Sequence, residues 1–329
     1  MVPTLAAGPK LVECLVSLVN QTERAFEVTV VDNSGKSLAR QAGAEGLGAT
    51  VLESAENVGF GAAVNAAVRG SEAPYVAVLN DDAVAHPDWL RSLLTALEAR
   101  PDAGMCASQI RLPGGERLDS AGMLIARDGS TKQRGHGEEP ARYARAEEVL
   151  FPSGAAALYR RAMLEEVGWF DEEFFLYCED SDLGLRARWA GWKCVYVPEA
   201  IVEHRYSGTA GGASALKAYY VERNRLLLIT KNFPASRLAA APVFALGRYF
   251  WHVLSIPAGA GSAGRFRRER HNPLELAFIV LRAHCAWLIR LPALWRQRRR
   301  ILAGARLSPS EFGQLLDAHA ITTREVALQ

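Results

Sequence analysis

Short apolar runs rich in β-branched residues alternate with helical patterns in the first third of the chain, and this alternation constrains the fold most strongly. Residues 27–32 (EVTVVD) and 75–79 (YVAVL) have the composition of strands, and the second run is apolar throughout, as expected for a strand covered on both faces. Helical spacing is shown by Leu11, Leu15, Leu18 and Val19, and by Leu90, Leu93, Leu94 and Leu97. Such alternation predicts parallel β/α units and an α/β fold.

Both predicted strands end in polar side chains that can contact a ligand. Asp32 closes the first run, and Asn80, Asp81 and Asp82 follow the second. Ligands of such sheets collect outside the C-terminal ends of the strands. We therefore expect Asp32 and the acidic step to face the same crevice.

The composition narrows the class of protein. The 329 residues are 49% hydrophobic and 22% charged, which is ordinary for a globular protein that buries a core. The cysteines have no paired short spacing, which argues against a zinc cluster or a disulfide framework and fits a reducing cytosol. They are Cys14, Cys106, Cys178, Cys194 and Cys285. No basic-then-apolar signal peptide opens the chain.

The pattern is less regular beyond the first third of the chain. Residues 112–150 lack periodicity and are rich in glycine and charge, which predicts a loop or excursion. A helix is predicted over 180–190 and a strand over 194–197. Residues 205–214 (RYSGTAGGAS) have the composition of a flexible loop, and 215–231 that of a long helix.

Positive charge is concentrated near the C-terminus. Residues 265–300 contain ten arginines and two glutamates and carry a net charge of +8, whereas the whole chain carries +2. Such a segment favours membrane lipid or nucleic acid as an anionic partner, and a solvated helix face is the alternative. No recognised nucleic-acid module accompanies the arginines, so the membrane is the better match.

An apolar stretch inside this segment approaches membrane-spanning length. It covers residues 274–291. On a helix, Glu275, Arg282 and Arg290 fall on one side, which predicts an amphipathic helix lying in a membrane interface rather than crossing it. A helix packed within its own domain explains the pattern equally well.

Two acidic clusters and a histidine have the chemistry of a site for metal binding and proton transfer. They are Asp81-Asp82, Glu179-Asp180 with Asp182, and His204. Carboxylates suit hard cations such as Mg²⁺ and Mn²⁺, and a carboxylate can take a proton from a hydroxyl. Each signal is weak alone, because acids at element ends are often solvated or act as helix N-caps, and a lone histidine is more often structural.

Seven stretches follow one another in an order typical of a known family. They are Val2-Pro3-Thr4; Val30-Val31-Asp32-Asn33-Ser34; Asn57-Val58-Gly59-Phe60-Gly61 with Asn65; Leu79-Asn80-Asp81-Asp82 with Pro87-Asp88; a region with Ser153-Gly154-Ala155, Gly168-Trp169-Phe170-Asp171-Glu172, Phe174 to Leu183, Arg186 and Gly191-Trp192; His204; and Glu222-Arg223-Asn224. Together they resemble the family 2 glycosyltransferases of GT-A fold, close to the bacterial rhamnosyltransferase-like branch, over about residues 2–232.

The resemblance implies contacts to a nucleotide sugar. Asp32 resembles the carboxylate that binds the base, although an Asx turn explains it equally well. Asp81 resembles the ribose-side residue. Asn65 and the Gly59 backbone look like nucleotide contacts, with helix–sheet packing as the alternative. The remaining positions implied on this side are Pro3, Thr4, Asn57, Asn80 and Arg186.

The resemblance also implies a divalent ion, Mn²⁺ or Mg²⁺, bound by Asp82 and His204. The family often has an acid where this chain has Asn80, so the metal site carries less negative charge and depends more on His204. Asp180 resembles the general base, with Glu179 as its competitor. Burial would raise the pKa of Asp180 and a helix N-terminus would lower it.

The acceptor side is assigned by the same likeness to Gly154, Trp169 and Asp182. Asp182 is a further competitor for the base. Arg186, one and a half turns beyond Asp180, is expected to pair with a carboxylate or with the diphosphate.

The implied reaction is a single in-line displacement with inversion at the anomeric carbon. The best candidate donor is dTDP-L-rhamnose, with UDP-, GDP- and other dTDP-sugars open, and the acceptor is a hydroxyl of a lipid-linked or polymeric cell-envelope glycan. A sugar-nucleotide nucleotidyltransferase would need a basic, glycine-rich loop, for which residues 6–10 (AAGPK) are a poor match. A non-catalytic glycan-binding scaffold is favoured only by Asn80.

The expected organisation is a GT-A domain over 1–232, with a mostly parallel sheet flanked by helices, and a helical, basic extension over 233–329. We expect a cytoplasmic protein, peripheral on the inner face of a bacterial cell membrane; a homo-oligomer stays open. Only Met1 and Val2 precede Pro3, so either the first strand is short or the assigned start lies downstream of the true one.

Overall fold

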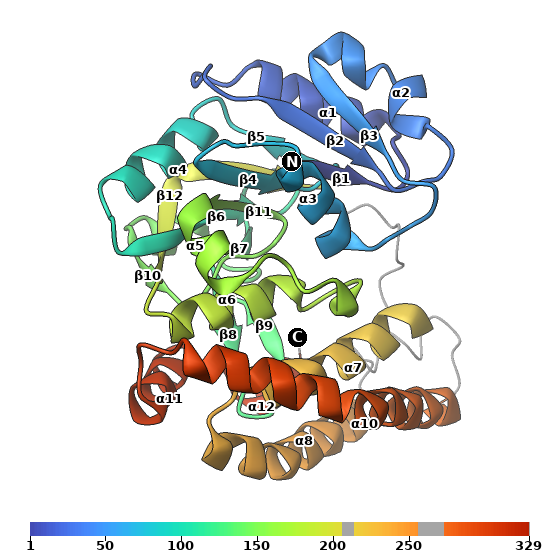
Figure 1. The fold of residues 1–329 in the computed structure, drawn as a ribbon, viewed down its shortest axis with the longest axis vertical. Helices are drawn as coiled ribbons and strands as arrows, with labels where there is room; N and C mark the ends of the chain where they lie inside the picture. Colours follow the sequence, from blue (N-terminus) through green and yellow to red (C-terminus); the bar gives the residue numbers. More distant parts are fainter. Residues whose placement is uncertain (206–213, 256–272, 329) are drawn as a thin grey trace. The chain divides into compact units, whose positions relative to one another are not determined.

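The computed structural model describes residues 1–205, 214–255 and 273–328, which form two compact units (Figure 1). The first unit comprises residues 1–123 and 133–209, and the second comprises 124–132 and 210–329. The division expected after residue 232 followed the extent of the family resemblance. The observed division differs from the expected one because α7 (Ala215–Asn232) packs along α10 (Pro273–Ala303).

The first unit begins with a three-stranded parallel sheet in the order β1-β2-β3. Its strands are β1 (Val2–Thr4), β2 (Val28–Asp32) and β3 (Ala49–Glu53). Met1 connects this sheet to a second one, since the Leu79 N–H donates to the Met1 carbonyl at 3.1 Å. The start of β1 therefore lies beside the C-terminal end of the strand that contains Leu79.

The second sheet is mixed, in the order β10-β12-β6-β11-β4, with β5 on β12 and β7 on β6. β12 runs parallel to β6, whereas β11 is antiparallel to both of its neighbours. The strands are β4 (Tyr75–Leu79), β5 (Ala83–Ala85), β6 (Ala103–Arg111), β7 (Leu118–Ser120), β10 (Glu147–Val149), β11 (Ala156–Arg160) and β12 (Lys193–His204). The parallel pairing expected from the β/α alternation thus holds for β1–β3 and for β6 with β12.

The helices predicted from leucine spacing are present. In α1 the residues Leu11, Leu15 and Leu18 are buried, and in α4 Leu90, Leu93 and Leu97 are buried. The helices of this unit are α1 (Pro9–Val19), α2 (Leu38–Gln41), α3 (Phe60–Arg69), α4 (Trp89–Glu98), α5 (Arg161–Val167) and α6 (Glu179–Trp189), with short 3-10 turns η1 (Ala44–Leu47), η2 (Pro140–Tyr143) and η3 (Glu172–Phe174).

The expectation of a loop over residues 112–150 was wrong. This segment contains β7, β8 (Met123–Ile125), β9 (Thr131–Gln133) and β10. Each strand has three residues, which is too short for an alternating pattern to be recognised. The strand expected over 194–197 is likewise longer, because β12 continues to His204.

The second unit is helical and also contains most of the β8–β9 hairpin, residues 124–132. Its helices are α7, α8 (Ala235–Ser255), α10, α11 (Pro309–Ala318) and α12 (Thr323–Leu328). The helix predicted over 215–231 is confirmed by α7. The predicted loop over 205–214 falls mostly on residues 206–213, which lie outside the described residues. Four of the ten arginines of the basic segment fall on residues 256–272, which also lie outside them.

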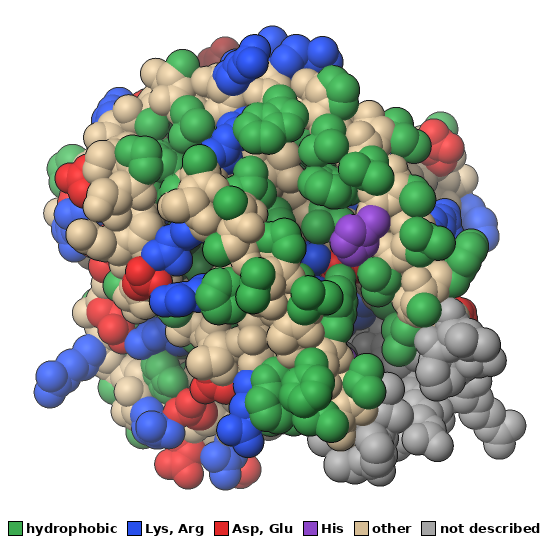
Figure 2. All heavy atoms as spheres, turned by 90° about the horizontal axis from the view of Figure 1, so that it is seen from below, with side chains coloured by type: hydrophobic (Ala, Val, Ile, Leu, Met, Phe, Trp, Pro, Cys, Tyr) green, Lys and Arg blue, Asp and Glu red, His purple; other side chains and the backbone are tan. Residues whose placement is uncertain are grey.

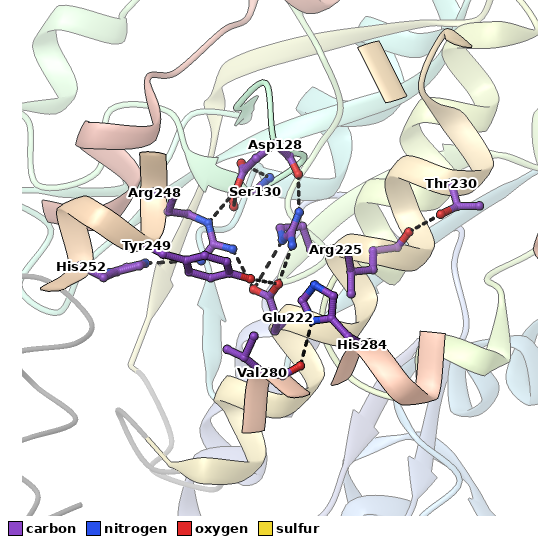
Figure 3. A network of polar contacts seen from close by, with 11 residues as sticks. Asp128, Ser130, Glu222, Arg225, Thr230, Arg248, Tyr249, His252, Val280 and His284 are labelled. Atoms are coloured by element: carbon purple, nitrogen blue, oxygen red, sulfur yellow. Dashed lines mark hydrogen bonds and ion pairs between the residues drawn. The ribbon is translucent and has the colours of Figure 1, made fainter. Parts of the chain in front are cut away.

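A buried ion network joins the hairpin to α7 and α8 (Figure 3). Arg248 Nε donates to Asp128 Oδ2 at 2.6 Å, and its Nη2 donates to Glu222 Oε2 at 2.8 Å. Arg225 donates to the other Glu222 oxygen at 2.5 Å and to the Asp128 carbonyl at 2.7 Å. Burial alone would raise the pKa of Glu222, but Arg225 and Arg248 hold it well below its usual range. Two acids and two arginines thus neutralise each other inside the unit.

Replacing Arg248 with methionine should destabilise the second unit by about 3–5 kcal/mol, because it leaves two buried carboxylates with one remaining cation. Urea unfolding followed by circular dichroism measures the effect. Arg127, which pairs with Asp317 at the surface, provides the matched control. Arg127→Met should cost less than about 1 kcal/mol; equal losses for the two variants would contradict a special role for the buried network.

Candidate active site

The acidic step forms the turn between β4 and β5. The Ala83 N–H donates to the Asn80 carbonyl at 3.1 Å and closes this turn. Thr4 Oγ1, at the end of β1, donates to Asp81 Oδ2 at 2.5 Å. Burial raises the pKa of Asp81, although the Thr4 hydrogen bond opposes that shift. The ends of β1 and β4 therefore meet at one carboxylate.

Asp82 lies beside His204, the last residue of β12. His204 Nε2 is 3.1 Å from Asp82 Oδ1, and the backbone of Arg205 donates to the Asp82 carbonyl at 2.9 Å. Both side chains are buried. The juxtaposition of Asp82 and His204, separated by more than a hundred residues in sequence, agrees with the prediction that they act together.

A third side chain, Asp119, completes this arrangement and was missed in the sequence. It lies in β7, and its Oδ2 is 2.9 Å from His204 Nδ1. Burial lowers the pKa of His204, but the hydrogen bonds to Asp119 and Asp82 outweigh burial and raise that pKa to about 9. The two carboxylates thus favour the protonated imidazole.

The Asp82–His204 pair fits a divalent ion. Two neighbouring ligands of an octahedral ion lie roughly 3 Å apart when each bond is about 2.1 Å, close to the observed N···O distance of 3.1 Å. Asp119 would then orient the imidazole from behind, as carboxylates do in many histidine–metal sites. Within the described ranges no cluster of three or more His, Cys, Asp or Glu side chains is suited to hold a metal by itself. Oxygens of a bound diphosphate would complete the ligand set.

Asp180 lies at the start of α6 and is held by several donors. Its Oδ2 accepts from the Gly154 N–H at 2.8 Å, and its Oδ1 accepts from the Ser181 N–H at 2.6 Å. Burial raises its pKa above the ordinary aspartate value, with these hydrogen bonds opposing the shift. The helix N-cap is Cys178, so the alternative of Asp180 or Asp182 as an N-cap is excluded.

Two consecutive residues, Gly154 and Ala155, connect Asp180 to the turn that contains Asp82. The Gly154 N–H donates to Asp180, while the neighbouring Ala155 carbonyl accepts from the Asn80 N–H at 2.9 Å. A Cβ on Gly154 would meet the Asp180 side chain at 3.3 Å, a tight contact. Gly154 thus acts as a spacer for Asp180, and its expected role toward the acceptor is untested.

The loop before α6 has an unusual backbone. Phe175, Tyr177 and Cys178 all have positive φ, at 62°, 70° and 67°. Non-glycine residues adopt such angles at a cost and mostly where the fold fixes them. This loop contacts Gly59, since the Phe60 N–H donates to the Phe175 carbonyl at 2.8 Å.

Gly59 itself permits that contact. Its φ is +87°, and an added Cβ would lie 2.4 Å from the Phe175 carbonyl oxygen. Asn57 Oδ1 accepts from the Gly59 N–H at 2.9 Å, so Asn57 shapes the same turn. Both residues position the loop, and a nucleotide contact by either stays a prediction.

Three predicted contact residues are used inside the protein. Asp182 and Arg186 form a buried ion pair at 2.8 Å, and Arg186 also donates to the carbonyls of residues 167–169, which places Trp169. Asn65 donates to the Phe170 carbonyl and to Glu172, both at 2.9 Å. Because the polar groups of Asp182, Arg186 and Asn65 are buried and hydrogen-bonded to protein partners, they hold these segments in place, and their expected substrate contacts stay predictions. For Arg186 the carboxylate alternative is the one observed.

Asp32 makes the Asx turn that was the alternative to base binding. Its Oδ1 accepts from the Ser34 N–H at 2.8 Å, and its Oδ2 accepts from the Ala39 N–H at 2.7 Å. Burial raises the pKa of Asp32, but these hydrogen bonds outweigh burial and lower it, so the side chain stays ionised. Pro3 pairs with Val31 beside it through the strand backbone.

Comparison with known proteins places this site in context. A family model described as Glycosyl transferase family 2 matches residues 1–168, just over half of the chain. An N-acetylglucosaminyl-diphospho-decaprenol L-rhamnosyltransferase of Mycobacterium tuberculosis is 34% identical over 243 residues, which are 66% of this chain and 79% of the relative.

Solved structures share the fold at low sequence identity. Mannosyltransferase PcManGT from Pyrobaculum calidifontis, in complex with GDP-Man and Mn²⁺, has a TM-score of 0.53 and 18% identity, with 94% of this chain and 85% of that one covered. S. aureus TarS 1-349 with UDP-GlcNAc has a TM-score of 0.55 and 15% identity over 95% and 90%. GalNAc-T7 with UDP, GalNAc and Mn²⁺ reaches 0.58 at 13% identity over 72% of this chain and 48% of that one.

The fold is that of the GT-A glycosyltransferases, as the sequence motifs indicated. More narrowly, the chain belongs to glycosyl transferase family 2 and is a glycosyltransferase. Family membership leaves no support for a nucleotidyltransferase or for a non-catalytic scaffold.

Proposed function

We propose that this enzyme is a metal-dependent, inverting glycosyltransferase that moves L-rhamnose from dTDP-rhamnose to a hydroxyl of a polyprenyl-linked or polymeric cell-envelope glycan. The observation that carries the proposal is the connection of Asp180 to the turn of Asp82 and His204 through Gly154 and Ala155. The similarity to the mycobacterial L-rhamnosyltransferase supports the transfer of rhamnose to a lipid-linked acceptor, and dTDP is proposed from the resemblance of the motifs to the rhamnosyltransferase-like branch.

In this reaction Asp180 accepts the proton of the acceptor hydroxyl. The hydroxyl oxygen then forms a bond to the anomeric carbon as the bond to the nucleoside diphosphate breaks on the opposite face, which inverts that carbon. The diphosphate leaves with the electron pair of the broken bond. A divalent ion on Asp82 and His204 would supply positive charge for this leaving group. Asp81 would face the ribose and Asp32 the base.

The expected location follows from the proposed acceptor. We place the enzyme at the cytoplasmic surface of the membrane, where it would meet a polyprenyl-linked acceptor, and the basic residues of the C-terminal part are compatible with such a surface.

A thermal-shift panel tests the donor class. We expect dTDP-rhamnose with Mn²⁺ to raise the melting temperature more than UDP-, GDP- or other dTDP-sugars, because a ligand that binds only the native state stabilises it by mass action. Chelation with EDTA should remove most of the shift. A preference for a UDP- or GDP-sugar would overturn the rhamnose assignment, and equal shifts with and without Mn²⁺ would overturn the metal dependence.

A further inference from the structure

Helix α8 exposes its apolar side. The exposed positions recur at helical spacing and contain no charged residue within the helix; they include Val243, Leu246, Phe250, Val253 and Leu254. Val243 is 69% exposed and Leu246 67%. A helix on the surface of a soluble protein usually has the opposite arrangement, with its polar side toward water.

The polar groups of α8 are turned inward. Arg248 is buried and bound to Asp128 and Glu222, while Tyr249 donates to Glu222 at 2.6 Å (Figure 3). The charge that would normally make this helix soluble is thus neutralised inside the unit. The outer face is left to valine, leucine and phenylalanine.

Helix α10 has a similar arrangement, except that its exposed side also contains the charged Arg282. Its buried side contains Ile279, Ala283 and Leu294, and it is fixed to α7 by hydrogen bonds from Trp287 to Thr230 Oγ1 and from Arg298 to backbone carbonyls. The opposite, exposed side is marked by Phe278, Leu281, Leu288, Ile289 and Trp295.

These two helices concentrate the exposed apolar surface of the described residues. Eleven of the eighteen large hydrophobic side chains that are exposed belong to α8 or α10. Figure 2 shows many hydrophobic side chains on the face that carries these helices. Apolar surface gathered in this way marks an interaction site rather than ordinary surface composition.

The charge at the end of α10 indicates the chemistry of the partner. After Trp295 the exposed side continues with Arg296, Arg299 and Arg300. An apolar face that ends in arginines matches a surface with acyl chains beneath anionic headgroups.

We propose that α8 and α10 lie on an anionic lipid bilayer, with their apolar faces in the interface and Arg296, Arg299 and Arg300 among the headgroups. By length and composition the segment Glu275–Ala303 of α10 could also cross a membrane. It lies flat instead, because its other side is hydrogen-bonded to α7, whose Glu222, Arg223 and Arg225 would have to enter the bilayer with it. This surface is independent of the donor and of the reaction.

Flotation of the full chain with vesicles tests the proposal. Wild-type protein should float with vesicles of phosphatidylcholine mixed with phosphatidylglycerol, and much less with phosphatidylcholine alone or at high salt. The double variant Leu246→Ser/Phe250→Ser should lower the vesicle affinity at least about tenfold, because two apolar side chains no longer enter the interface. The matched control is Val16→Ser/Val19→Ser on α1, where both side chains are also exposed; it should bind like wild type.

The charge contribution is tested by Arg296→Gln/Arg299→Gln/Arg300→Gln. Roughly fivefold should be lost per arginine, and only on anionic vesicles. Unchanged vesicle binding in the α8 variant would overturn the proposal. So would a wild-type dimer that the α8 substitutions dissociate, since a second copy would then cover this face. Nucleotide-sugar hydrolysis measured without vesicles shows whether each variant is folded. A wild-type protein that hydrolyses no nucleotide sugar would count against the proposed function and not against the membrane surface.

Discussion

Asp180→Asn should lower the rate of sugar transfer by at least about a hundredfold while donor binding stays close to that of wild type. The amide has the size of the carboxylate and can still accept one of the hydrogen bonds from Gly154 and Ser181, but it cannot accept the proton of the acceptor. Steady-state transfer and a donor-induced thermal shift, measured on the same preparation, separate the chemical step from binding.

Glu179→Gln is the matched control for this variant. Burial, with the neighbouring Asp180 adding to it, raises the pKa of Glu179, and its Oε2 is buried with no hydrogen-bond partner in the described structure. A carboxyl in that setting is protonated near neutral pH and cannot act as a base, so its amide should transfer sugar at nearly the wild-type rate. Near-normal transfer by Asp180→Asn with loss in Glu179→Gln would reverse the assignment.

The pH profile gives a second measure of the same residue. The base must be ionised to work, and burial raises the pKa of Asp180. Activity should therefore fall on the acid side at a pH above the ordinary aspartate pKa of about 4. A profile flat down to pH 4 would contradict this role.

The fold could be predicted in outline because its signals were local and long enough. The apolar run that became β4 and the leucine spacing of α1 and α4 each extend over five or more residues. The antiparallel placement of β11 depends on pairing with residues fifty or more positions away, which no local pattern encodes.

The site was predicted where a motif contained the residue and missed where it did not. Asp82, Asp180 and His204 belong to the family motifs and meet at one place in the fold. Asp119 sits in a three-residue strand without a motif, and only pairing with β6 carries it to His204. The residues on either side of it, Leu118 and Ser120, form no pattern that signals this role.

Arg186 and Asn65 show a limit of a different kind. Arg186 lies in α6 and Asn65 in α3, both near the site, but polar residues in such positions can hold a neighbouring protein segment instead of the ligand. Arg186 donates to three consecutive carbonyls and to Asp182, which spends nearly all the hydrogen-bonding capacity of its guanidinium. Only the structure shows whether such a residue is placed to bind the ligand or to hold the protein backbone.

The exposed apolar side of α8 could not be predicted, although its sequence is plainly amphipathic. Periodicity shows that a helix has two sides, but it does not show which side is buried. The ion network decides this, because Arg248 finds Asp128 and Glu222 from distant segments. The sequence indicated a membrane surface only through the basic segment 265–300, whereas α8, which precedes that segment, carries half of the surface that we propose.

Asp119→Asn should weaken Mn²⁺ binding by about 10–100-fold, the usual cost of removing a carboxylate behind a metal-binding histidine. Asp119 accepts from His204 Nδ1 and so leaves Nε2 directed at Asp82, where the ion would bind. An asparagine can present an amide N–H instead, which allows the imidazole to turn. The free Mn²⁺ remaining in a titration, measured by electron paramagnetic resonance, reports the affinity without any turnover.

Two further variants decide whether Asp119 acts through His204. Asp119→Glu keeps the charge and should recover part of the affinity. His136→Gln removes the other side chain beside Asp119, 3.3 Å from its Oδ1, without touching His204, so Mn²⁺ should bind to this variant almost as to wild type. If His136→Gln weakened Mn²⁺ as much as Asp119→Asn, the loss would come from disturbing β7 in general. If Asp119→Asn bound Mn²⁺ like wild type while His204→Ala did not, His204 would be a ligand that needs no carboxylate to orient it.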